Sequence, residues 1–351
     1  MILFIFSRIS QLPLMPIDTA LIATSGTWLA EPGSVRAATA APVCVELEQL
    51  GVIEAHGPDA VPFLQTQLTN DLQHLVVGHL QLNGYCTPKG RLIAVFDCWR
   101  NSENVYLQLP REILPQVLKR LSMYVLRSKV KLADASADWA CRAILGPGAA
   151  VALGHAGLSP PEVGQTHLTG TTLVARLRDS PRIPERFLAI VPRTDAQALH
   201  DRLRAVRGAD SAAWWWSQID AGIASIFAAT QERFVPQMIN LEVLGGVSFK
   251  KGCYPGQEIV ARSQYLGKLR RRMAIAHIQG ETRAGADVFA HGDAQPAGTV
   301  VMAATAPDGG MDLLFEAPVD RASAATLLAN APDGPKLDVR SLPYALFDPT
   351  A

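Results

Sequence analysis

One short segment of the chain, residues 250–258, gathers a thiol, two ammonium groups, a carboxylate and two glycines in the order Lys-Lys-Gly-Cys-Tyr-Pro-Gly-Gln-Glu. The glycines and Pro255 interrupt any regular helix or strand, so the backbone must form a loop that brings Cys253 close to another group. Positive charge on Lys250 and Lys251 favours the thiolate form of a neighbouring cysteine. The segment therefore predicts a reactive or ligand-contacting thiol.

The composition is typical of a soluble globular protein with room for two or three domains. The chain has 351 residues, of which 48% are apolar, and a formal net charge of +0. A balanced charge removes any overall attraction to nucleic acid or to an anionic membrane surface. We therefore expect no direct binding to nucleic acid and no membrane partner.

The cysteines do not form a recognisable framework. There are five of them, widely spread and without a CxxC pair. An odd, scattered set argues against structural disulfides and against a cysteine-built zinc site, so we expect no metal. The simplest setting is the reducing cytoplasm.

Residues 1–41 are rich in Ala, Thr, Pro and Ser and predict a poorly ordered N-terminal tail. The apolar run 1–6 is too short to span a bilayer, and it precedes Arg8, whereas a signal peptide carries its positive charge before the apolar run. We expect this tail to be neither a signal peptide nor a membrane anchor.

From residue 42 onward, one order of elements occurs twice: strand, helix, strands, helix. The first set has strand-like runs at 51–56, 80–86, 91–99 and 105–109, and the second has them at 139–145, 174–177 and 187–191. A repeat offset of roughly 80–90 residues suits two related α+β units, predicted at 42–136 and 137–210. Residues 211–266 are expected to pack back on the first unit. Residues 267–351 alternate short β-like runs with turns, which predicts a small β-barrel.

Three adjacent tryptophans, residues 214–216, lie in the segment that follows the second unit. Successive side chains of a helix point about 100° apart, so the three rings cannot all face one core. At least one ring should face a groove, a ligand or another domain. Two interpretations stay open: the rings seal a domain junction, or they form a flat apolar wall for a planar ring.

With these residues in view, the chain resembles the YgfZ family of folate-binding proteins, which are relatives of the glycine-cleavage aminomethyltransferase and of a mitochondrial iron-sulfur assembly factor. The resemblance rests on residues 250–258, which are similar to the family's Lys-Gly-Cys-Tyr-x-Gly-Gln-Glu signature. It is supported by residues 57–60, 67–72, 88–91 and 234–241, and it extends from about Cys44 to the C-terminus.

The resemblance implies an α+β, aminomethyltransferase-like fold in which the two units surround a tetrahydrofolate-binding channel, with a C-terminal β-barrel beside them. It implies a folate contact at Trp214, and Leu50 stands where the family has a second tryptophan. Lys251 and Arg262 are expected to meet the acidic tail of folate. The remaining signature residues are candidates for the site together with the Cys253 thiol: Gly252, Tyr254, Gly256, Gln257 and Glu258.

One departure from the enzymes of this superfamily concerns catalysis. Their acidic pair, a few residues past the glycine that corresponds to Gly90, is replaced here by Ala94 and Val95. Loss of that carboxylate removes a general acid or base worth ~100-fold or more. Asp97 lies three positions beyond Ala94 and should face the opposite side of the strand. Aminomethyl transfer is therefore not expected.

Three interpretations of Cys253 remain. In the first, the loop only packs domains together, with Glu258 paired to a lysine. A nucleophilic enzyme needs a base, and none of the eight histidines is near Cys253 in sequence, although folding can bring one close. The resemblance favours a third: a redox-sensitive thiol, or a transient cluster ligand that needs a partner protein because one cysteine cannot hold a cluster.

The resemblance therefore implies a non-enzymatic, tetrahydrofolate-binding accessory protein that supports assembly or repair of iron-sulfur proteins, with indirect effects on tRNA modification. Its expected partners are folate and the iron-sulfur assembly or client proteins, with transient contact to a cluster. The alternative is a folate-dependent one-carbon transferase or demethylase.

Overall fold

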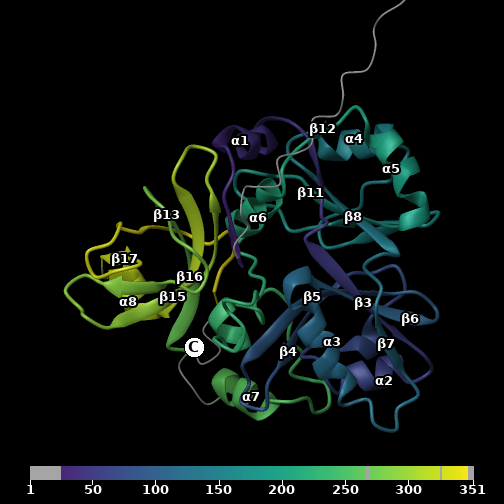
Figure 1. Ribbon diagram of the computed structural model, residues 1–351, viewed down its shortest axis with the longest axis horizontal. Helices are drawn as coiled ribbons and strands as arrows, with labels where there is room; N and C mark the ends of the chain where they lie inside the picture. Colours follow the sequence, from purple (N-terminus) through teal and green to yellow (C-terminus); the bar gives the residue numbers. More distant parts are fainter. Residues whose placement is uncertain (1–24, 266–268, 325, 347–351) are drawn as a thin grey trace, which may run out of the picture.

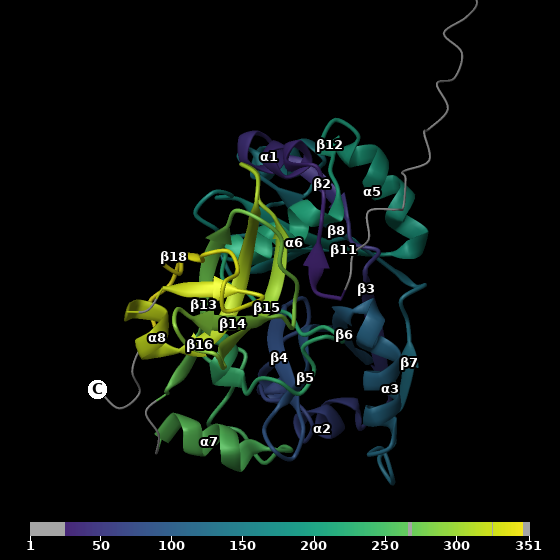
Figure 2. The same ribbon diagram turned by 60° about the vertical axis from the view of Figure 1, so that its left-hand side comes forward.

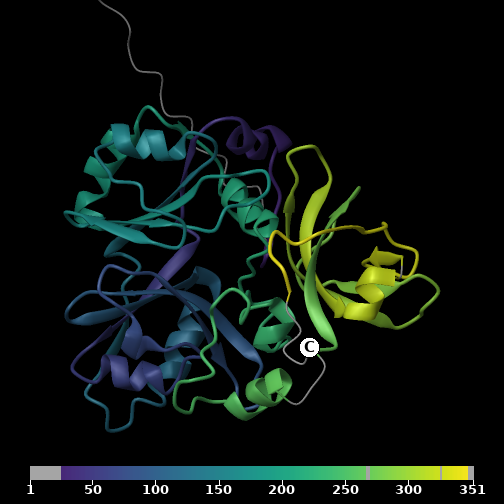
Figure 3. The same ribbon diagram turned by 180° about the vertical axis from the view of Figure 1, so that it is seen from behind.

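The computed structural model describes residues 25–265, 269–324 and 326–346, which form three β-sheets with short helices around them. Two sheets lie one above the other, and the C-terminal sheet stands beside both (Figures 1 and 3). The α+β fold predicted from the sequence is confirmed. No helix of the described residues is long and apolar enough to cross a membrane.

The first sheet is antiparallel and has the strand order β4-β5-β6-β3-β7. The strands are β3 (Leu50–His56), β4 (Gln81–Cys86), β5 (Leu92–Arg100), β6 (Asn104–Pro110) and β7 (Lys131–Asp134). The helices of this unit are α2 (Ala60–Gln65), η1 (Leu72–His74), η2 (Arg111–Ile113) and α3 (Leu114–Ser122). Helix α3 buries Leu114, Val117 and Leu121, whose spacing makes one apolar face.

The second sheet has the order β12-β2-β8-β11-β10-β9. Its strands are β2 (Val43–Glu46), β8 (Trp139–Leu145), β9 (Thr166–Thr169), β10 (Thr172–Arg176), β11 (Arg186–Pro192) and β12 (Arg207–Gly208). Its helices are α4 (Ala149–His155), η3 (Arg193–Asp195) and α5 (Ala196–Leu203). Strand β2 pairs with β8, so residues 43–46 lie in the second sheet, although the sequence placed them in the first unit.

The third sheet is curled and has seven strands, in the order β17-β14-β15-β16-β13-β18 with β1 added beside β15. The strands are β1 (Thr27–Trp28), β13 (Arg271–Ile278), β14 (Asp287–Ala290), β15 (Pro296–Thr305), β16 (Met311–Pro318), β17 (Leu327–Ala329) and β18 (Asp338–Arg340), and helix α8 (Val319–Ala324) follows β16.

The predicted N-terminal tail is wrong for the part that the structure describes. Strand β1 pairs in parallel with β15, and helix α1 (Pro32–Ala40) follows it. Helix α1 buries Val35 and Ala38 in the core that also contains the three tryptophans. The composition, rich in small residues, suggested a disordered tail. Ala is nevertheless a good helix former, and its small side chain allows the helix to pack closely against the core. Residues 1–24 of the predicted tail lie outside the described residues.

The chain after the second sheet links all three sheets. Helix α6 (Ser211–Asp220) packs against α1, β2 and the C-terminal strands β15 and β16. The chain then returns to the first sheet, where Leu92 N donates to Phe234 O at 2.7 Å and Ser248 N donates to Thr69 O at 3.0 Å. The short helix η4 (Pro236–Ile239) and helix α7 (Gln257–Tyr265) lie in this returning segment. Helix α7 lies at the same end of the molecule as α2 and far from α1 (Figure 2).

Candidate functional site

A cavity of about 230 Å³ lies between the first and second sheets, beside α6. Strands β5 and β6 supply one wall, the end of β10 and the residues after it supply another, and α6 closes the third side. Leu50 and Trp214, two of the four positions that the resemblance assigned to folate, both line it. The fold thus brings together two predicted residues that lie far apart in the sequence.

Helix α6 is buried on every side, which explains the run of three tryptophans. Trp214 and Trp215 line the cavity, and the ring of Trp215 stacks on Trp28 with centroids 4.3 Å apart. Trp216 turns toward the C-terminal sheet, where its Nε1 donates to Asp312 Oδ2 at 2.8 Å. The same helix therefore packs against the C-terminal sheet through Trp216 and forms a wall of the cavity through Trp214 and Trp215.

The cavity contains a carboxylate that the sequence prediction set aside. Asp97 lies on the face of β5 opposite to Ala94, as predicted, but this is the face that it shares with Val95 and that lines the cavity. Burial raises the pKa of Asp97 to about 6, and the positive charge of Arg186 opposes the rise. Among the described residues, no side chain forms a hydrogen bond or ion pair with the Asp97 carboxylate.

Further polar atoms at the cavity lack partners. Gln108 lies directly opposite Asp97 in the β5–β6 pair, and its Nε2 donates to Cys141 Sγ at 2.8 Å. Its Oε1 is buried and has no hydrogen-bond partner in the described structure, and the same holds for Nε1 of Trp214 and Nε1 of Trp215. Buried polar groups are normally hydrogen-bonded, so atoms left in this state beside a cavity indicate that water or a ligand fills it.

Arg186 supplies a buried positive charge behind the cavity. Its guanidinium donates to Arg178 O at 2.7 Å and to Ser217 Oγ, and its carbon lies 5.9 Å from the centroid of the Trp214 ring. Desolvation lowers its pKa to about 10, so it keeps its charge at neutral pH. This charge stabilises anionic groups in and around the cavity.

The signature loop is attached to the first unit through buried contacts. Lys251 is buried, and its Nζ donates to the backbone carbonyls of Gln65 and Leu68 and, at 3.0 Å, to Asn70 O. Desolvation lowers its pKa to about 8. The Lys251 ammonium already donates to three backbone carbonyls, and Lys251 does not line the cavity. Lys251 therefore anchors the signature loop to the first unit. Reasoning from sequence could not find these partners, which lie about 180 residues away.

Two more signature residues complete the attachment. Tyr254 is buried, and its ring centroid lies 5.3 Å from Lys251 Nζ. Gly256 has φ +80°, and a Cβ there would lie 2.4 Å from Thr87 O, so only glycine fits against the turn of residues 87–90. This contact packs the signature loop against the turn formed by residues 87–90.

Cys253 lies at the exposed part of this anchored loop, next to the exposed Gly252. Glu258 is also exposed, and Gln257 is half-buried at the start of α7. Neither Cys253 nor Arg262 lines the cavity. The described residues contain no group of three or more His, Cys, Asp and Glu side chains that could hold a metal ion. The thiol and the cavity are therefore separate sites.

A basic groove of about 880 Å³, absent from the sequence predictions, lies beside the same turn. Arg271 in this groove is paired with Glu316, whereas four other cations have no ion pair in the described structure. The four unpaired cations come from three separate segments: Lys89, Arg91, Arg120 and Arg233. A cluster of unpaired cations favours contact with an anionic surface.

Comparisons with known proteins agree with this architecture. The family model of the GCVT N-terminal domain matches residues 26–159. The crystal structure of glycine cleavage system aminomethyltransferase T from Bartonella henselae superposes with a TM-score of 0.73 at 19% identity and covers 90% of each chain. The chain therefore has an aminomethyltransferase-like fold, and its residues 26–159 match the GCVT N-terminal domain.

Sequence relatives narrow the class. The tRNA-modifying protein YgfZ of Serratia proteamaculans is 30% identical over 318 residues, which are 87% of this chain and 93% of that protein. The tRNA-modifying protein YgfZ of Colwellia psychrerythraea is 28% identical over 288 residues, which are 77% of this chain and 87% of that protein. The chain belongs to the YgfZ family, as its signature predicted.

Proposed function

We propose that this chain is a tetrahydrofolate-binding accessory protein that supports the assembly or repair of iron-sulfur proteins, with an indirect effect on tRNA modification. The observation that carries the folate part is the cavity beside α6, with its aromatic wall and its polar atoms without protein partners. Such a mixture of apolar surface and a few convergent polar groups is the usual composition of a ligand site.

The size of the cavity suits the head of folate. Ligand pockets usually enclose ~300–1,000 Å³, and this cavity is smaller, at about 230 Å³. It has room for a bicyclic pterin, while the spacer and the glutamate tail extend from its opening. Arg178 lines the cavity and has no ion pair in the described structure, so we assign to it the tail contact that the sequence placed on Lys251 and Arg262.

The second part of the proposal concerns Cys253. Buried anchors at Lys251, Tyr254 and Gly256 hold the loop, so the exposed thiol is presented in a defined place. Thiolates are natural ligands of iron-sulfur clusters, but one cysteine needs further ligands from a partner. The basic groove beside the loop would attract an acidic partner surface and orient it. The name of these relatives, tRNA-modifying protein YgfZ, fits an effect on tRNA through iron-sulfur enzymes.

Asp97 favours one competing function, a folate-dependent one-carbon transferase or demethylase. A cavity carboxylate with a pKa of about 6 is suited to proton transfer near neutral pH. This candidate requires that purified protein turn over a one-carbon folate with an amine acceptor, and that Asp97→Asn abolish the turnover. The accessory function requires no turnover.

The accessory function is tested in cells that depend on this chain. We expect cells that carry Cys253→Ala to have lower iron-sulfur enzyme activity under oxidative stress. The purified variant should still bind tetrahydrofolate. Cys44→Ala is the matched control, because Cys44 is half-buried on β2 in the second sheet and away from the loop. Full enzyme activity in the Cys253→Ala cells would reject the role of the thiol.

A further inference from the structure

Asp97 and Gln108 place two hydrogen-bond acceptors side by side in the cavity. The two residues are direct partners in the antiparallel β5–β6 pair, so their side chains leave the same face with Cβ atoms ~5 Å apart. Neither the Asp97 carboxylate nor Gln108 Oε1 receives a hydrogen bond from a described residue. The pair therefore needs donors, and these must come from whatever fills the cavity.

The number and type of the acceptors define the matching ligand edge. A carboxylate accepts two parallel N–H bonds from neighbouring nitrogens, and Oε1 of Gln108 can accept a third N–H beside them. A 2-amino-4-oxopyrimidine ring presents this set, with one ring N–H next to an exocyclic amino group that carries two hydrogens. The indole Nε1 groups of Trp214 and Trp215 remain as donors for acceptor atoms elsewhere on the same ring system.

We propose that Asp97 and Gln108 select ligands by the 2-amino-4-oxopyrimidine edge of a pterin head. The inference rests on the proposed function and names the atoms that give it specificity. Asp97 accepts from the ring N–H and one amino hydrogen, and Gln108 accepts from the other amino hydrogen. A ring without the 2-amino group keeps only the ring N–H for Asp97, so one carboxylate oxygen and Gln108 Oε1 stay unpaired in a buried site, which is the costly outcome.

The groups that act on Asp97 leave its carboxylate ionised when the edge is bound. Burial raises the pKa of Asp97 to about 6, and the positive charge of Arg186 on β11 opposes the rise, so the carboxylate is mostly ionised at pH 7. Arg176 and Arg178, which line the cavity, are also positively charged. The nearby thiols of Cys98 and Cys141 stay neutral, because burial raises the pKa of Cys141 to about 12 and that of Cys98 well above its usual value. Hydrogen bonds from the ligand then stabilise the charged form further.

Calorimetric titration tests the inference with three probes: tetrahydrofolate, 2-amino-4-oxopteridine, and 4-oxopteridine without the amino group. We expect Asp97→Asn to weaken binding of the first two by about 10-fold to 100-fold and the third probe to bind weakly to both proteins. Glu103→Gln is the matched control, because it removes one negative charge from an exposed turn of the same sheet. It should leave all three affinities unchanged.

The outcomes separate the inference from the proposed function. Tight binding of tetrahydrofolate that is indifferent to Asp97→Asn and to the amino group overturns the inference and leaves the function standing. Binding of 2-amino-4-oxopteridine through Asp97 without binding of tetrahydrofolate overturns the function and keeps the inference. Absence of binding by any probe overturns both.

Discussion

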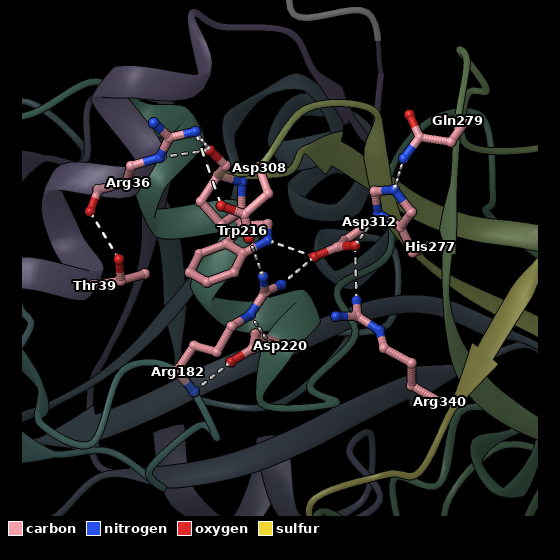
Figure 4. Close-up of polar contacts among 11 residues, drawn as sticks. Arg36, Thr39, Arg182, Trp216, Asp220, His277, Gln279, Asp308, Asp312 and Arg340 are labelled. Atoms are coloured by element: carbon pink, nitrogen blue, oxygen red, sulfur yellow. Dashed lines mark hydrogen bonds and ion pairs between the residues drawn. The ribbon is translucent and has the colours of Figure 1, made fainter.

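Trp216 donates its indole N–H to Oδ2 of Asp312 at 2.8 Å, which joins the tryptophan helix to the curled C-terminal sheet (Figure 4). Asp312 is fully buried, and it also contacts Arg182 from the second unit, Arg340 at 2.7 Å and His277 Nδ1 at 2.8 Å. One carboxylate thus gathers side chains from three parts of the chain, one of which is the helix that also forms a wall of the cavity.

Asp312→Asn is predicted to destabilise the protein by about 3 kcal/mol, because the partly buried Arg182 and Arg340 lose the charge of a fully buried carboxylate. Urea unfolding measures the change. Asp308→Asn is the matched control, since Asp308 is largely exposed and meets Arg36 at 3.8 Å and Arg182 at 3.5 Å. We expect the control to change stability by less than about 1 kcal/mol. Equal effects of the two substitutions would contradict a structural role for the buried junction.

The same junction predicts a stability that depends on pH. Burial alone would raise the pKa of Asp312, but Arg340, Trp216, His277 and Arg182 outweigh it and lower the pKa below 3.8. A carboxyl group whose folded-state pKa is lowered stabilises the folded state above its unfolded-state pKa. The stability is then lost as the pH falls below about 4. Unfolding in urea at pH 5 and pH 3 should show the loss in the wild type and a smaller loss in Asp312→Asn.

Two glycines of the signature loop are predicted to differ sharply. Gly256→Ala should cost more than about 1 kcal/mol, since φ is +80° and the new Cβ would lie 2.4 Å from Thr87 O. Gly252→Ala should be nearly neutral, because no heavy atom lies within 4 Å of a Cβ there. Thermal unfolding of the two variants gives the comparison. A similar loss in both would show that the loop is not held against the turn at residues 87–90.

Asp97→Asn is predicted to stabilise the ligand-free protein at pH 7 while it weakens pterin binding. The folded-state pKa of Asp97 is raised to about 6, so between about pH 4 and pH 6 the folded protein holds a proton that the unfolded chain has lost. Stability therefore falls as the pH rises from about 4 to 6, and the Asn variant escapes a penalty of order 1–3 kcal/mol. Urea unfolding at pH 4.5 and pH 7 tests this. A variant that is less stable at pH 7 would assign Asp97 a purely structural role.

Cys253 is predicted to be the first thiol to react with iodoacetamide in the native protein. It is exposed, whereas Cys44 and Cys141 are half-buried and burial raises their pKa values to about 11 and about 12. Thiols react as thiolates, so the buried groups should react slowly at neutral pH. Mass spectrometry of the labelled peptides measures the rates. Faster labelling of Cys44 would place the accessible thiol outside the signature loop.

Local patterns in the sequence account for much of the fold. The run at 139–145 became β8 with the same bounds, and Leu50 and Trp214 both reached the cavity. The bounds of β8 could be predicted because strand alternation depends on neighbouring residues, whereas the folate contacts of Leu50 and Trp214 stay predictions. The pairing of β2 with β8 and the three carbonyls around Lys251 could not be predicted, since each joins segments far apart in sequence.

Asp97 shows a subtler limit. The alternation of β5 correctly placed it opposite Ala94, but only the packed second sheet reveals that the cavity is on the side of Asp97. A residue's face follows from the strand, whereas what that face meets follows from tertiary packing. The missing acidic pair therefore did not leave the cavity without a carboxylate.

The central claim is that the cavity beside α6 binds tetrahydrofolate while Cys253 acts at a separate place. Calorimetric titration of the wild type and of Cys253→Ala with tetrahydrofolate tests it most directly. We predict one saturable site per chain in both proteins, with affinities that agree within about twofold, because the thiol does not line the cavity. No saturable heat in the wild type, or binding that disappears with the thiol, would contradict the account.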